Sequence, residues 1–346
     1  MELSNRKKAL IALIVKGYND TGEPVGSKAL CETLGNISSA TIRNEMSDLT
    51  ELGYLSQPHT SAGRVPTAKA YRLYIDSLMV KHNLTVAERG LIDSLLPSRV
   101  DDYEQALRTA IRALSDATRC AALVTSEADS GTLIHRIELI PMGSYAALLV
   151  VLTSTGMVSS RMIRLRSQLN PALSERFINI TNAELVGTEM KSLHPAALQT
   201  LVASAGDYAL ELAPLMSALA NLISSACEAQ LEVTGETKLL NYSEFPVSKM
   251  REIFDILSRR DEIITLLDMR AGDAGVILGE DTSYEALSMA SMIVAKYHMN
   301  TARSGYIGVI GPVRMDYERI IPSIEYFAQS LGALALGQTS SMKGLI

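Results

Sequence analysis

The feature of this sequence that most constrains its fold is a succession of short helical patterns followed by a small hairpin, all within residues 1–76. Apolar residues at helical spacing predict a first helix over 4–18, and a cluster of turn residues follows it. A second helix is predicted over 28–34 and a third, longer helix up to Leu52, and a serine suited to N-capping stands before each. Two helices joined by a short turn form the helix-turn-helix pattern.

A small β-hairpin is predicted directly after the third helix. Residues 54–57 have the pattern of a short strand, 58–63 that of a tight loop, and 64–66 that of a return strand. Thr67 is suited to cap a further helix that runs through Asp76. Helix, turn, helix and hairpin in this order predict an N-terminal winged-helix domain over residues 1–76.

The rest of the chain divides by pattern into four segments. Residues 77–118 are predicted to form a helical linker, 119–170 are rich in strand patterns, and 171–233 are mostly helical. Strand and helix patterns alternate over 234–346, where the last helix is expected to break near Pro322. This order predicts an α+β multidomain chain, in which one α/β domain in two segments carries a mostly helical insertion.

Composition narrows the class of protein. Apolar residues make up 47% of the chain and charged residues 20%, which is ordinary for a soluble globular protein. The longest apolar run, over 146–152, is far shorter than the ~20 residues that a membrane helix needs. Cys31, Cys120 and Cys227 are too scattered for a disulfide scaffold or a cysteine metal site. We therefore expect a cytoplasmic protein without a membrane segment.

The charge is distributed unevenly along the chain. Residues 1–76 hold nine Lys or Arg against eight Asp or Glu, so this segment carries +1 while the remainder carries −7 of the total of −6. The asymmetry is mild, but its sign is that of a nucleic-acid-binding module on an acidic body.

Patterns that would indicate an enzyme are missing from the sequence. The five histidines never fall at metal-ligand spacing, and there is no Gly-x-Ser-x-Gly motif. Gly305, Gly308 and Gly311 match neither a dinucleotide fingerprint nor a P-loop, and they indicate a tightly packed strand before Pro312. We predict no catalytic residue, no cofactor and no metal.

The predicted third helix has one apolar side and one side suited to reading DNA. Ile42, Met46 and Leu49 share a sector and are expected to dock on the domain core. The opposite side carries a small residue, an arginine, an amide and a hydroxyl, namely Ala40, Arg43, Asn44 and Ser47. Arg pairs well with guanine and Asn with adenine in the major groove. Hydroxyls at the amino end are expected to contact a phosphate, namely those of Ser38, Ser39 and Thr41.

The hairpin loop adds a second set of candidate DNA contacts. Its hydrogen-bonding residues are Gln57, His59, Thr60, Ser61 and Arg64, and Gly63 permits close approach of the backbone. In a winged helix such a loop lies against the phosphates or the minor groove. The simpler alternatives are a solvated helix face and a polar surface turn, but the two features beside a helix-turn-helix favour DNA binding.

The same segments resemble HrcA, the family of bacterial heat-inducible transcription repressors. The resemblance is carried by residues 24–30, 38–49, 57–67 and 71–76, and it returns at 307–317. Both ends match in order, so it extends over essentially the whole chain, although the middle matches only in pattern.

The resemblance implies a winged helix, a GAF-like domain over 119–170 and 234–346, and an inserted dimerisation domain over 171–233. It also implies a homodimer that binds an inverted-repeat operator, the CIRCE element, before chaperonin and chaperone operons, and whose activity the GroEL chaperonin maintains. Lys28 stands where many members have Arg, which favours a phosphate contact over base reading. The alternative is a regulator whose GAF-like domain senses a small molecule.

Overall fold

The computed structural model describes residues 3–34, 37–59, 62–96, 103–128, 131–193, 201, 208–270, 274–300 and 303–335. The chain forms two compact units. The first comprises Met1–Thr125, Leu231–Tyr297 and Tyr306–Ile346, and the second comprises Ser126–Gln230 and His298–Gly305.

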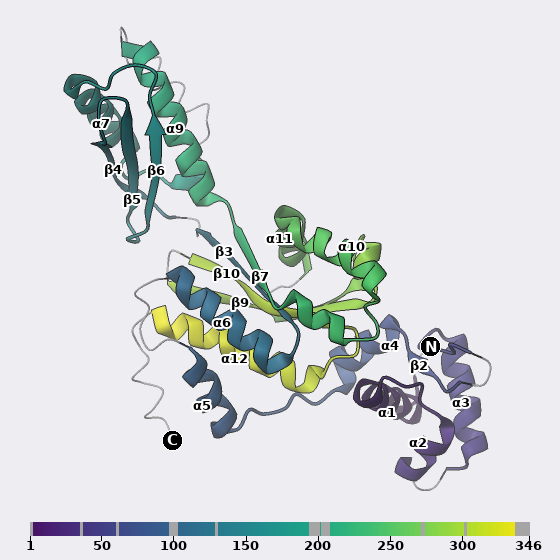
Figure 1. Ribbon diagram of the computed structural model, residues 1–346. Coiled ribbons are helices and arrows are strands. Elements are labelled where there is room, and N and C mark those ends of the chain that lie inside the picture. The colour runs from purple at the N-terminus through teal and green to yellow at the C-terminus, as the bar shows by residue number, and fades with distance from the viewer. Residues whose placement is uncertain are drawn as a thin grey trace. The chain divides into compact units, whose positions relative to one another are not determined.

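The N-terminal part of the first unit is a winged helix (Figure 1). Its elements are α1 (Asn5–Thr21), α2 (Ser27–Leu34), α3 (Ser39–Glu51), β1 (Leu55–Ser56), β2 (Val65–Pro66) and α4 (Ala68–Leu73). The hydroxyls of Ser4, Ser38 and Thr67 cap α1, α3 and α4. The helix-turn-helix and the hairpin are thus confirmed. The helix predicted after Thr67 is α-helical only to Leu73 and continues as a π-helical turn, η1 (Tyr74–Leu78).

The predicted apolar side of the third helix forms the core of this domain. Ile42, Met46 and Leu49 of α3 are buried, as are Leu10 and Ile14 of α1. The helical spacing of apolar residues therefore identified both the helix and its buried side correctly.

A five-stranded sheet forms the centre of the first unit, with strand order β7-β3-β10-β9-β8. The strands are β3 (Ala121–Ala128), β7 (Gln230–Thr234), β8 (Ala274–Leu278), β9 (Ala290–Asn300) and β10 (Arg303–Pro312). The helices α10 (Val247–Ser258) and α11 (Arg260–Arg270) lie on one side, and α6 (Tyr103–Thr118) and α12 (Tyr317–Ala335) lie on the other (Figure 1). This is the GAF-like domain. Short helical turns complete the chain at η2 (Met190–Ser192), η4 (Glu236–Asn241), η5 (Gly279–Asp281) and η6 (Glu285–Leu287).

The glycines before Pro312 are explained by close packing, as predicted. A Cβ atom at Gly308 would lie 2.3 Å from the carbonyl oxygen of Ile293 in β9. One at Gly311 would lie 2.8 Å from the sulfur of Cys120 and 2.7 Å from that of Met315. These glycines let neighbouring elements approach β10 at distances that a side chain would prevent.

The predicted linker over 77–118 requires correction. It contains α5 (Val86–Leu95) and α6, and α6 is part of the sheet domain because Ala110 and Leu114 are fully buried. The side chains of α6 cover the sheet beside α12. The segment 77–118 is therefore helical as predicted, but only its first part connects two domains.

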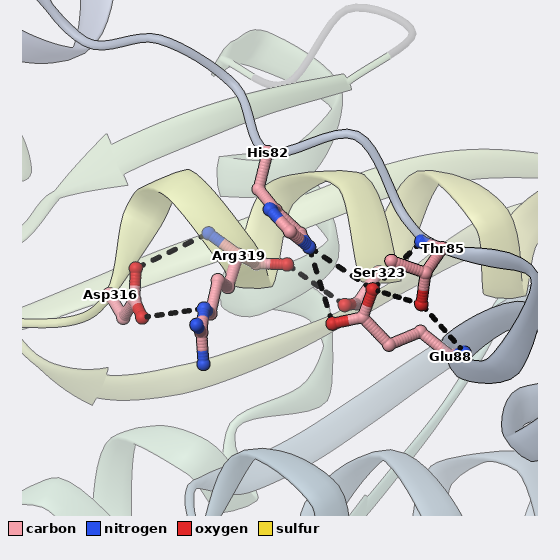
Figure 2. Close-up of polar contacts among 6 residues, drawn as sticks. All are labelled: His82, Thr85, Glu88, Asp316, Arg319 and Ser323. Carbon is pink, nitrogen blue, oxygen red and sulfur yellow. Dashed lines mark hydrogen bonds and ion pairs between the residues drawn. The ribbon is translucent and has the colours of Figure 1, made fainter.

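The expected break near Pro322 is absent, because α12 runs through this residue. Proline has no N–H to donate to the carbonyl four residues earlier, which belongs to Glu318. The backbone N–H of His82 donates to that carbonyl instead, at 2.9 Å. The His82 ring contacts Glu88 at the start of α5, where Thr85 and Glu88 form a capping box (Figure 2).

The second unit has a three-stranded antiparallel sheet with helices on one face. Its elements are β4 (Ile134–Pro141), β5 (Ala146–Thr153), β6 (Val158–Arg164), α7 (Pro171–Leu185) and α9 (Ala209–Cys227). Alternate residues of β5, such as Leu149 and Val151, are buried in one core with Phe177 of α7 and Leu219 of α9.

The boundaries predicted for the insertion are therefore corrected. Strands β4–β6, which the sequence analysis grouped with the first segment of the GAF-like domain, share a core with the two helices. Residues 230–233, predicted as the end of the helical insertion, belong to the strand β7 (Gln230–Thr234). Alternating hydrophobicity identified the strands, but it does not say which sheet a strand joins.

One helix in the described part of the chain, α9, is long and apolar enough to cross a membrane by length and composition. Its apolar side is buried against the three-stranded sheet. Ser217, Asn221 and Ser224 face outward, so the two sides differ as they do in the core helix of a globular domain.

Candidate nucleic-acid interface

The side of α3 that faces away from the core carries the residues predicted to read DNA. Ala40, Thr41, Arg43 and Asn44 are exposed, and Ser47 is half-buried. The buried residues Ile42, Met46 and Leu49 hold the helix against α1, so the polar side faces outward. The helix is thus oriented for entry of its amino-terminal half into a groove.

Arg43 and Asn44 are the two side chains of this face that are free to bind. Among the described residues, neither side chain has a hydrogen-bond or ion-pair partner, and both are exposed. An exposed guanidinium and an exposed amide one residue apart can form bidentate hydrogen bonds to neighbouring base edges. This is the chemistry that the sequence pattern predicted.

The hydroxyls predicted to contact phosphate have partners within the domain. Ser38 Oγ accepts the N–H of Thr41 at 3.1 Å and lies 2.9 Å from Thr41 Oγ1. Ser39 Oγ lies 3.0 Å from the hydroxyl of Ser27, and Ser47 Oγ donates to the carbonyl of Arg43 at 3.1 Å. They shape the start of α3, whose backbone amides are the groups suited to an anion.

The hairpin presents exposed donors and a tightly packed base. Gln57 and His59 are exposed, and Gln57 Nε2 donates to the carbonyl of Ala62 at 3.2 Å. Thr60 and Ser61, predicted to contact DNA, lie outside the described residues. Lys28 is exposed in the first turn of α2, and its side chain has no hydrogen-bond or ion-pair partner among the described residues.

Gly63 and Arg64 fix the wing to the segment before α2. Arg64 and Val25 exchange two backbone hydrogen bonds, each 2.9 Å long. A Cβ atom at Gly63 would lie 2.5 Å from the Val25 carbonyl carbon and oxygen, so glycine is required by this approach. The half-buried Arg64 side chain donates from Nε to Thr50 Oγ1 at 3.0 Å. Both residues thus have roles inside the domain that the sequence analysis did not foresee.

Two ion pairs between α1 and α3 were also missed by the sequence analysis. Arg6 pairs with Glu45, and Lys7 Nζ lies 2.8 Å from Asp48. Glu45 is buried, although an exposed position is usual for glutamate. The sequence contained a signal for these pairs. Glu45 and Asp48 lie three residues apart beside the apolar sector of the third helix, and the adjacent cations Arg6 and Lys7 lie in the first helix. The two pairs connect the start of α1 with α3.

A helix-turn-helix with a hairpin wing, joined to a GAF-like domain, defines a transcription regulator of the winged-helix class. Two family models match the chain. The "Winged helix-turn-helix transcription repressor, HrcA DNA-binding" model covers residues 2–78, and the "HrcA protein C terminal domain" model covers residues 104–321. The chain belongs to the HrcA family of heat-inducible transcription repressors, so it is not an enzyme.

Relatives named "Heat-inducible transcription repressor HrcA" match over nearly the full length. The protein of Brevibacillus brevis is 32% identical over 97% of this chain and 99% of its own. That of Syntrophobacter fumaroxidans is 33% identical over 96% of this chain and 97% of its own. A solved structure, titled "Crystal structure of a hypothetical protein at 2.2 A resolution", is 23% identical, covers 98% of this chain and 99% of its own, and has a TM-score of 0.62. It has the same fold.

Proposed function

We propose that this repressor binds an inverted-repeat operator of the CIRCE type in double-stranded DNA, as a homodimer in the cytoplasm, and so represses chaperonin and chaperone operons. The observation that carries the proposal is the outward face of α3, where Arg43 and Asn44 are exposed and without partners among the described residues. Arg43 is assigned to a guanine and Asn44 to an adenine of each half-site. Ala40 has a small side chain, so the helix can approach the bases closely beside Arg43 and Asn44.

The backbone contacts are assigned to the rim of this face. Lys28, the amino end of α3 and the wing surround it, and their groups suit phosphate oxygens. The side chains assigned to this rim are those of Lys28, Ser38, Ser39, Thr41, Ser47, Gln57, His59, Thr60, Ser61 and Arg64. Since the serine hydroxyls have partners inside the domain, backbone amides carry the contacts at the start of α3.

The homodimer is assigned to the uncovered face of the three-stranded sheet. Leu148 of β5 lies between Ile140 of β4 and Met162 of β6, on the face opposite α7 and α9. Ile140 is 46% exposed, Met162 52% and Val158 61%. A row of apolar side chains on one open face is typical of a surface that a second copy covers. Two winged helices then bind two half-sites, which gives specific affinity that one domain alone lacks.

Substitution of Met162 by glutamate tests the dimer and the operator together. A charge beside Leu148 on the uncovered face is expected to give a monomer by light scattering, with weak and sequence-independent DNA binding. Val247→Glu is the control, because Val247 is 79% exposed in the first unit, outside the proposed interface. A dimeric Met162→Glu variant with full affinity for the operator would contradict the assignment.

We further propose that the GroEL chaperonin maintains the active fraction of the repressor. The chain has 15 Met, no Trp and four Phe, and a multidomain chain with such flexible apolar residues exposes apolar surface while it folds. Repressor refolded from denaturant is expected to bind operator poorly alone and to regain binding with GroEL and ATP.

Titration of active molecules against excess operator measures this effect. The chaperonin should raise the active fraction at an unchanged dissociation constant, since it changes folding and not the interface. Full activity after unassisted refolding would contradict the proposal. The same assay with a small-molecule extract tests the alternative regulator, for which a changed dissociation constant is expected.

A further inference from the structure

Glu318 at the start of α12 is a meeting point between the winged helix and the GAF-like domain, both of which lie in the first unit. Its carboxylate oxygen Oε1 lies 2.9 Å from Lys16 Nζ of α1 and accepts the Tyr74 hydroxyl of η1 at 2.7 Å. Its carbonyl accepts the backbone N–H of His82 at 2.9 Å. One residue of the GAF-like domain therefore binds three segments that belong to or follow the winged helix. We call these four residues the Glu318 clasp.

A second set of contacts lies beside the clasp. Asn19 Nδ2 donates to the carbonyl of Met315 at 2.8 Å, and Asn19 Oδ1 accepts the Tyr71 hydroxyl at 2.7 Å. The rings of Tyr71 and Tyr317 pack with centroids 6.0 Å apart, and both are almost completely buried. Arg72 donates to the carbonyl of Val276 at 3.0 Å, on the edge strand β8.

The tyrosines of these contacts are withdrawn from water, whereas the ion pair is only partly so: the side chain of Glu318 is 26% exposed and that of Lys16 51%. Burial raises the pKa of the Tyr71 hydroxyl, and burial together with the bond to Glu318 raises that of Tyr74. Burial alone would raise the pKa of Glu318, but the bonds from Lys16 and Tyr74 outweigh it and hold the pKa below its usual range. The charge-assisted bond from the buried Tyr74 hydroxyl to Glu318 therefore fixes geometry more firmly than the exposed pair with Lys16 does.

We propose that the Glu318 clasp holds each winged helix in one orientation on the GAF-like domain, so that the repressor selects operators by the spacing between their half-sites. This inference rests on the proposed binding of a dimer to an inverted repeat. One added base pair moves a half-site by about 3.4 Å and rotates it by about 35°. A winged helix held by the clasp cannot turn on its own GAF-like domain to follow that displacement, so this way of keeping both sets of base contacts is closed.

Without the clasp and the second set of contacts beside it, the winged helix would be joined to the rest of the first unit mainly through the segment over 79–85, between η1 and α5. A short segment without regular structure permits many orientations. A repressor tethered in this way would accept several spacings with similar affinity. Spacing selectivity therefore distinguishes a clasped winged helix from a tethered one.

The experiment measures the affinity of the full chain for inverted repeats whose spacers differ by zero, one and two base pairs. We expect the affinity of the natural chain to fall about tenfold or more with each added base pair, because one winged helix loses its base contacts. The triple variant Asn19→Ala, Tyr74→Phe and Glu318→Gln, which weakens both sets of contacts, should lose less than about threefold per base pair, with affinity at the natural spacing within a few-fold. Asn19→Ala, in the second set of contacts, should act in the same direction.

Lys238→Met is the matched control. It removes an ion pair of 2.5 Å with Asp116 that lies wholly within the GAF-like domain, so the spacing dependence should stay that of the natural chain. Binding of a duplex with a single half-site should be equal in all variants and reports whether each winged helix is folded.

Three results would overturn the inference while leaving the proposed function intact. The first is that the clasp variants and the natural chain depend on spacing equally. The second is that the natural chain binds all spacers with equal affinity. The third is that the variants bind the natural spacing more tightly than the natural chain does. Failure of the natural chain to bind any inverted repeat specifically would overturn the proposed function together with this inference.

Discussion

Replacing Gly63 by alanine should detach the wing from the segment before α2. The added Cβ would lie 2.5 Å from the backbone of Val25 and 2.7 Å from the carbonyl oxygen of Pro24, and backbone atoms cannot move aside as a flexible side chain can. The movement that relieves this clash separates the Val25 and Arg64 backbones, which exchange two hydrogen bonds. With about 0.5–1.5 kcal/mol for each bond, the wing should lose roughly 1–3 kcal/mol of local stability.

Hydrogen exchange of the full chain measures this loss at the two amides that make the bonds. At about 2 kcal/mol, exchange at Val25 and Arg64 should be roughly 30-fold faster than in the natural chain. Gly26→Ala is the matched control, because a Cβ at Gly26 meets nothing within 4 Å. It should leave exchange unchanged or slow it slightly. Equal exchange in the Gly63 and Gly26 variants would refute the steric argument.

Other predictions concern single residues. Arg43→Ala should cost about 1–3 kcal/mol on the operator and relax selection at one base pair of each half-site, whereas an equal loss on random duplex would contradict base reading. Arg64→Ala should weaken operator and random DNA alike and lower the salt slope by about one, and it should also loosen the wing through loss of the bond to Thr50. The backbone and hydroxyl of Thr85, with His82, lower the pKa of Glu88 to about 2, so its contribution to stability is present above pH 4.5 and disappears as the pH falls towards 2. An NMR titration of Glu88 should show this midpoint, and Thr85→Ala should shift it towards 4.5; a midpoint already near 4.5 in the natural chain would exclude the capping box.

The parts of the fold that local sequence determines were predicted well. The cap at Ser38, the apolar spacing of α3 and the hairpin residues are signals that act within a few residues of the feature they produce. Ser27, predicted to cap the second helix, is instead the first residue of α2, and its hydroxyl lies 3.0 Å from that of Ser39. The exposure of the polar side of α3 could be predicted in the same way, since the side opposite a buried stripe of a helix is known once the stripe is known, while its contact with DNA stays a prediction. Arg43 and Asn44 were assigned from this geometry alone, and the structure leaves both exposed.

The parts that depend on contacts distant in sequence were not predicted. Burial of Glu45 requires Arg6 on another helix, and the demand for glycine at 63 requires the backbone of Val25. Strands β4–β6 were assigned to the GAF-like domain because their alternation does not show that α9 covers them. In each case, a partner supplied by the tertiary fold decided the outcome.

The hydrogen bond that bridges Pro322 and His82 limits how the family can vary at these two positions. The bond to the Glu318 carbonyl uses the backbone of His82 and not its ring, so any residue except proline can supply it. Among homologues, proline at 322 should therefore occur together with a residue other than proline at 82, while the imidazole itself is free to change. Where 322 is not proline, its own N–H competes for the same carbonyl, and position 82 is released from the constraint. An alignment that contains both proline and other residues at position 322 would show this dependence as covariation. The two positions are 240 residues apart in the sequence, and position 82 contributes only its backbone to the contact.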